Sequence, residues 1–203
     1  MKHFLIWMLG MAVVGSSWAQ SAMHEDAYGV LGYQFTKENL QPAEIAAFSD
    51  RARQKLIDVS SYLEVIAEDQ YDTAMRKEAG RIAVAMFLDQ KERFWFVSSD
   101  CAGHALREIG GYVAELAEKA DGKSLRHQVD SVWVAEPAVL EGEGRYRGTL
   151  GFSAVSTAAR EDEAVCVHRI AGKINFWVVR EKKAFGNKKK KVWAVKLGSV
   201  LEG

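Results

Sequence analysis

Two cysteines are each followed closely by a histidine, and these thiol–imidazole pairs are the side chains most suited to metal or redox chemistry. Cys101-x-x-His104 and Cys166-x-His168 together supply four ligands of the kind that zinc prefers. The second pair suits a shared ion poorly, because residues two apart on a strand lie about 6.5 Å from each other. A Cys101–Cys166 disulfide is the leading interpretation in an oxidising compartment; two free buried thiols, a metal site and a catalytic thiol are the alternatives.

The first residues of the chain indicate such a compartment. A short positive start at residues 1–3 and an apolar run at residues 4–15 precede Ser17-Trp18-Ala19, which offers small residues where signal peptidase requires them. The run is shorter than the roughly 20 apolar residues of a membrane span. No cysteine follows at once for lipid attachment. We expect a signal peptide over residues 1–19, cleavage before Gln20, and a soluble periplasmic or secreted protein.

A further group of candidates could serve acid–base catalysis or line a ligand site. Burial can bring the pKa of an aspartate or histidine close to the working pH, and an enzyme would use Asp130, His127 or His168 in this way. None stands in a motif that identifies an enzyme, so the leading hypothesis assigns no catalytic residue and no cofactor or metal. The predicted ligand-contacting side chains are aromatic, and Trp193 would join them if the tryptophans shared one face: Tyr62, Tyr146, Trp133 and Trp177.

A lysine-rich stretch near the C-terminus reads KKAFGNKKKKVW. It is predicted to be the solvated tip of a hairpin, where charge also blocks edge-to-edge pairing of strands. The alternative is a patch that binds an anionic surface, with an affinity that falls as salt rises. The patch would consist of six side chains: Lys182, Lys183, Lys188, Lys189, Lys190 and Lys191.

The first half of the domain has helical periodicity. Apolar residues recur every three or four positions from Ile45 to Ile66, after Pro42, which suits a first helical turn. Asp72 or Thr73 can cap a second helix. Residues 94–97 (FWFV) predict a short strand, and a third helix is expected from Leu106 to about Ala120.

The second half alternates with the period of strands. Four strands are expected, at about 126–140, 145–157, 165–182 and 192–201. Glycine-rich residues 141–144 join the first pair, and Gly186-Asn187 joins the last. Gly172 is expected to mark a bulge. Helices followed by an antiparallel sheet predict an α+β domain over residues 42–203, preceded by an irregular arm over residues 20–41.

The charges of the chain are balanced overall. Lys+Arg and Asp+Glu number 27 each, and loss of the leader removes only Lys2 and leaves 26 against 27. No global field therefore favours nucleic acid, and any charged partner must meet a local patch.

The element order resembles the nuclear-transport-factor-2-like group, the cone-shaped relatives of the cystatin-like fold. The resemblance covers about residues 42–201 and includes the ending KVWAVKLG at residues 191–198, which also looks like that of exported proteins of unassigned role in Bacteroidetes-type bacteria. It implies helices packed on a curved four-stranded antiparallel sheet. Family members use the cone as an enzyme pocket, as a ligand site or not at all, so the fold does not assign the function.

Our hypothesis from the sequence is an exported, non-catalytic domain that binds a small molecule or an envelope protein. The first alternative is an isomerase or lyase with an acid–base group in the cone, and the second is a structural component of an envelope assembly. A homodimer through the sheet is expected from the resemblance, without nucleic acid as a partner and without a membrane span after leader cleavage.

Overall fold

The computed structural model describes residues 39–97, 104–118, 123–142, 144–160 and 166–201. The chain divides into the units Met1–Lys37 and Glu38–Gly203, and only the second is described below. The predicted signal peptide and most of the predicted arm lie outside the described residues, so both stay predictions. Within the described ranges, no helix is long and apolar enough to cross a membrane.

Two helices open the domain, α2 Pro42–Ala67 and α3 Thr73–Ala85. Asp72 caps α3, because its Oδ1 accepts a hydrogen bond of 2.8 Å from the backbone N–H of Met75. Both helices and the cap agree with the sequence prediction. The predicted stripe of α2 is half-buried at its start, at Ile45, and buried from Ala52 on: Ala52, Leu56, Val59, Leu63 and Ile66.

The predicted third helix is wrong at its start. Strands β1 Arg93–Val97 and β2 His104–Glu108 form a small antiparallel sheet in which Trp95 pairs with Leu106, and α4 spans only Ile109–Glu118. The strand at residues 94–97 needs a partner for its backbone hydrogen bonds, and the residues before Ile109 supply it. The expected helix end near Ala120 lies outside the described residues.

Four long strands complete the domain: β3 Lys123–Glu141, β4 Arg145–Arg160, β5 Cys166–Phe185 and β6 Lys188–Leu201. They form one antiparallel sheet in the order β3-β4-β5-β6. Gly186, with φ of +58°, opens the two-residue turn between the last two strands, as predicted. The bulge predicted at Gly172 is wrong. Gly172 pairs in register with Phe152, and the register shift lies between Ile174 and Phe176.

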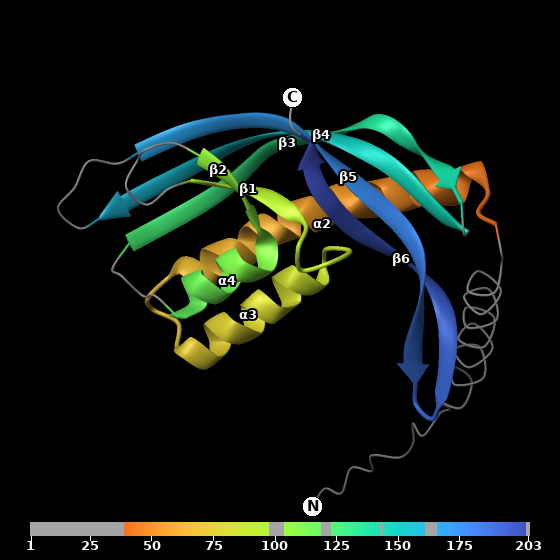
Figure 1. The fold of residues 1–203 in the computed structure, drawn as a ribbon, viewed down its shortest axis with the longest axis horizontal. Helices are drawn as coiled ribbons and strands as arrows, with labels where there is room; N and C mark the ends of the chain where they lie inside the picture. The colour runs from red at the N-terminus through yellow and green to blue at the C-terminus, as the bar shows by residue number, and fades with distance from the viewer. Residues whose placement is uncertain (1–38, 98–103, 119–122, 143, 161–165, 202–203) are drawn as a thin grey trace, which may run out of the picture. The chain divides into compact units, whose positions relative to one another are not determined.

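The sheet curves over the helices, which all lie on its concave side (Figure 1). Side chains of α2, α3, α4 and β1 meet those of the sheet in a single core. The predicted α+β class, with helices packed on a curved four-stranded antiparallel sheet, is therefore confirmed, and the element order differs from the expected one only by the added strand β2.

Candidate functional site

Much of the concave face of the sheet is filled with apolar side chains. Phe152 and Phe176 point inward from β4 and β5 and are 2% and 0% exposed. Phe94 of β1 stacks on Phe152 with ring centroids 6.5 Å apart, and Phe96 stacks on Tyr112 of α4 at 3.5 Å. Burial raises the pKa of Tyr112 above its usual value, so its hydroxyl stays neutral. This part of the sheet is hydrophobic core.

A row of polar residues crosses the concave face near the start of β3. His127 pairs in register with Ser156 of β4, and Ser156 pairs with His168 of β5. Residues directly opposite on antiparallel strands point to the same face with Cβ atoms about 5 Å apart. The Nδ1 of His127 and the Oγ of Ser156 share a hydrogen bond of 2.8 Å, while His168 is only partly buried.

His127 has the electrostatics of a neutral hydrogen-bonding group. It is 5% exposed, and its ring and that of Phe96 lie edge to face with centroids 6.3 Å apart. Burial lowers the pKa of His127 from 6.5 to about 4, because an imidazolium loses its hydration there. A general base works best with a pKa near the working pH. His127 is therefore better suited to donate or accept a hydrogen bond, and its buried Nε2 has no such partner in the described part of the chain.

Asp130 is not part of this row. The register of β3 and β4 shifts between Val129 and Ser131, so Asp130 lies at a bulge and is exposed. It lines a groove of about 610 Å³ between α2 and β3, together with Asp50, Arg53 and Gln54. Of the three predicted acid–base candidates, the structure places His127 and His168 in one row, with Ser156 between them, and places Asp130 elsewhere.

The four predicted ligand-contacting aromatic residues do not form one site. Tyr146 is buried, and its hydroxyl accepts a hydrogen bond of 2.8 Å from the backbone N–H of Leu40. Tyr62 packs against the core from α2. Trp133 and Trp177 lie on the convex face, since each alternates with inward-facing neighbours. Trp193 does not join them, because its ring contacts Tyr146 on the concave side.

The convex face presents tryptophan and arginine side chains. The Trp133 ring lies over Gly151 of the neighbouring strand and is 49% exposed. Two guanidinium groups of β4 lie over the Trp177 ring, Arg145 at 4.8 Å and Arg147 at 5.8 Å from its centroid. These four side chains, Trp133, Trp177, Arg145 and Arg147, are called the convex patch below.

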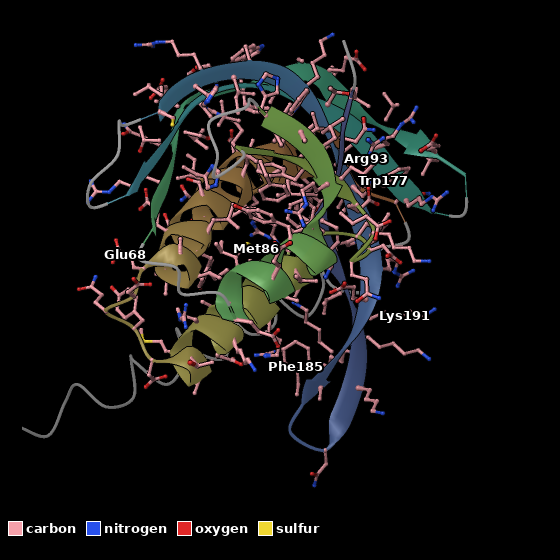
Figure 2. All side chains as sticks on the ribbon, turned by 60° about the vertical axis from the view of Figure 1, so that its left-hand side comes forward. Glu68, Met86, Arg93, Trp177, Phe185 and Lys191 are labelled. Carbon is pink, nitrogen blue, oxygen red and sulfur yellow. The ribbon has the colours of Figure 1, made fainter. Side chains whose placement is uncertain are left out.

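The six predicted patch lysines lie on the hairpin of β5 and β6 and are all exposed. They are brought together by strand pairing: Lys182 is opposite Lys191, and Lys183 is opposite Lys190. The hairpin extends past the helices, and Lys191 points away from them (Figures 1 and 2).

The structure describes one of the two cysteines of the predicted disulfide. Cys166 lies in β5 and packs against the core, whereas Cys101 lies outside the described residues, so their pairing stays a prediction. Among the described side chains, no three histidine, cysteine or acidic groups converge as a metal site.

Sequence reasoning missed several of these partners. Arg145 and Arg147 flank the inward-facing Tyr146, and this alternation was the signal for their common outward face. Ser156 gave no signal, because its place beside His127 depends on strand register. Lys55 of α2, half-buried near the lysine hairpin, was hidden within a helical pattern.

No protein-family model matches the chain, and no curated protein is similar to it. It is similar to the solved structure of Aln2 from a Streptomyces species, at 13% identity over 79% of this chain and 93% of that one, with a TM-score of 0.28. It is also similar to the beta subunit of the benzoate 1,2-dioxygenase from Burkholderia mallei, at 15% identity over 78% and 91%, with a TM-score of 0.31. TM-scores this low carry no argument about function.

Proposed function

We propose that the chain is an exported, non-catalytic domain that binds an envelope protein through the convex patch. The observation that carries the proposal is the difference between the two faces of the sheet. The concave face is occupied by the domain's own aromatic side chains, whereas the convex face exposes tryptophan and arginine. These two residue types are enriched among the side chains that dominate the energy of protein interfaces.

Site-specific photo-crosslinking in the source cells tests this proposal. A photoreactive amino acid at Val139, which pairs with Arg147 and is 62% exposed, should give one adduct of defined mass. The same group at Met75 of α3, which is 51% exposed, is the matched control and should not give that adduct. Trp133→Ala together with Trp177→Ala should abolish it.

The outcomes separate the possible partners. An adduct of twice the chain mass identifies a second copy, in line with the predicted homodimer, and any other mass identifies a different protein. The same adducts from both positions, or an adduct that survives loss of both tryptophans, would rule out the convex patch as the interface.

Export and the disulfide belong to the same proposal. We expect the chain recovered from a periplasm to begin at Gln20, as N-terminal sequencing can establish. Intact mass should rise by two thiol adducts only when a reductant precedes alkylation, because Cys101 and Cys166 are then released. Closing a loop of about 65 residues would contribute roughly 4 kcal/mol in the chain-entropy model. Labelling of both thiols without reductant would contradict the pairing.

A second candidate function is supported by the buried Nε2 of His127, which lacks a partner in the described part of the chain. A small molecule with a hydroxyl or carbonyl group would supply one. Native mass spectrometry of the purified chain should then show a bound molecule that His127→Phe releases and His104→Phe retains. Identical spectra for the two variants would remove this candidate.

A further inference from the structure

The outer part of the β5–β6 hairpin concentrates positive charge on a regular two-stranded ribbon. Residues 182–191, called the lysine ribbon below, keep their antiparallel pairing up to the turn at Gly186 and Asn187. Opposite residues point to the same face, and successive pairs alternate. Lys182, Lys189 and Lys191 therefore share one face, and Lys183, Lys188 and Lys190 share the other. No acidic residue occurs within the ribbon.

This arrangement disfavours the hairpin itself. Like charges directly opposite each other across two strands destabilise the pairing. In the described part of the chain, none of the six lysines pairs with a carboxylate, although other cations of the domain do, such as Arg107 with Glu115. A solvated tip requires polar residues, and residues of both signs would serve as well. Charge of one sign on both faces instead favours an anionic partner.

Two further lysines, Lys55 and Lys196, lie where the ribbon joins the domain. Lys196 of β6 is already engaged, since its Nζ lies 3.0 Å from a Glu181 oxygen and donates a hydrogen bond of 2.7 Å to the carbonyl of Ala85. Burial, followed by the charge of Lys196, lowers the pKa of the half-buried Lys55 of α2, against the opposing effect of Glu181. Lys183 of the ribbon acts in the same direction. The carboxylates of Glu181 and Asp58 oppose these charges, so the excess of positive charge lies in the ribbon itself.

We propose that the lysine ribbon binds the phosphate groups of anionic phospholipids at a bilayer surface. Charge complementarity requires an anion, and the residue type favours lipid over protein. Lysine is depleted at protein interfaces, where arginine and aromatic residues predominate. Clusters of four to eight basic residues are the usual means of attraction to anionic lipid. Lysine is the only charged residue type in the ribbon, which extends past the helices (Figure 1).

Vesicle sedimentation tests the proposal with the chain as it is recovered from a periplasm. Vesicles of phosphatidylcholine alone are compared with an equimolar mixture with phosphatidylglycerol. We expect binding only to the mixture, with a steep decrease as ionic strength rises from about 0.01 M to about 0.15 M. Each lysine near such a surface contributes about fivefold in affinity. K188Q/K189Q/K190Q should therefore bind about a hundredfold more weakly.

A matched variant removes the same number of charges elsewhere. K91Q/R126Q/R169Q changes three exposed cations outside both the ribbon and the convex patch, and its binding should stay within about threefold of the unchanged chain. Equal losses in the two triple variants would mean that only net charge matters and would overturn the proposal. Thermal unfolding of both variants shows whether the fold persists.

Two other results would also overturn it. Equal binding to both kinds of vesicle would exclude a role for anionic lipid. Binding of the ribbon to soluble polyglutamate but not to vesicles would instead identify an acidic protein as the partner. The crosslinking at Val139 is independent of either result, because the convex patch and the ribbon are different surfaces.

Discussion

The two faces of the sheet differ in what their side chains accomplish, although one set of strands forms both. Along β4, Tyr146, Leu150 and Phe152 point inward and are buried, while Arg145 and Arg147 alternate with Tyr146 and point outward. The inner residues contact helices and the small β1–β2 sheet. The two outer arginines instead lie over the Trp177 ring of the neighbouring strand.

This difference separates stability from binding. Burial of large apolar side chains supplies most of the favourable free energy of folding. The exposed half of Trp133 contributes little to it, and that area remains available to a partner. We therefore expect substitutions on the concave face to change the free energy of unfolding, and substitutions on the convex face or ribbon to change binding.

The largest effect should come from truncating a ring on the concave face. Phe176 is 0% exposed, so Phe176→Ala loses its transfer free energy and leaves a cavity, with an expected cost of about 4 kcal/mol. Trp133→Ala on the convex face is the matched variant and should cost less than about 1 kcal/mol. Urea denaturation monitored by circular dichroism measures both. Similar losses for the two variants would mean that the convex face is also covered.

A smaller effect should follow from protonation of His127. Its folded pKa of about 4 lies below 6.5, so the unfolded chain binds more protons between these values. Its contribution is complete above about pH 6.5, is lost as the pH falls towards 4, and amounts to about 3 kcal/mol. Urea denaturation across this window should show a shallower pH slope for His127→Phe than for the unchanged chain. His168→Phe, in the same row but partly exposed, is the control; an equal change of slope in both variants would argue against burial as the cause.

Periodicity correctly predicted the elements that depend on residues close to one another in the sequence. The stripe of α2, the cap at Asp72 and the turn at Gly186 all depend on neighbours within a few residues, and the structure confirms them. Leu106 was predicted to be helical, although it pairs with Trp95 in a strand. Trp95 is eleven positions away, and the spacing of apolar residues along the chain gives no sign of that pairing.

The composition of the candidate site depended on strand register, which alternation alone does not determine. Strict alternation from His127 would place Trp133 on the concave face. The register shift between Val129 and Ser131 moves Trp133 to the convex face and sets Asp130 apart from His127. For this reason neither the predicted acid–base set nor the predicted aromatic set forms one site. Each set combined residues from the two sides of a bulge or from opposite faces of the sheet.

Gly148 and Gly151 of β4 face opposite sides of the sheet, so a glycine-to-alanine change can be compared on the two faces. A Cβ at Gly148 would lie 2.5 Å from the buried Phe176 ring and 3.0 Å from the backbone nitrogen of Ala138, so Gly148→Ala should cost about 2 kcal/mol. A Cβ at Gly151 would lie 2.2 Å from the Trp133 ring, which is half exposed and can turn away. Gly151→Ala should therefore change the free energy of unfolding by less than about 0.5 kcal/mol. Thermal unfolding decides between them, and a larger loss at Gly151 would show that Trp133 is held in place.

The smallest effect concerns the lysine ribbon and should have the opposite sign. Lys191→Glu places a carboxylate opposite Lys182 and replaces repulsion by attraction, which should stabilise the domain by about 0.5 kcal/mol at low salt. Lys191→Gln removes the repulsion only and should give part of that gain. Raising the ionic strength should abolish both gains, because exposed pairs are screened.

The same two variants should bind anionic vesicles more weakly than the unchanged chain, and Lys191→Glu should bind more weakly than Lys191→Gln. A loss of stability in Lys191→Glu would contradict the register of the ribbon. A gain in stability with unchanged vesicle binding would show that its charge does not serve the membrane surface.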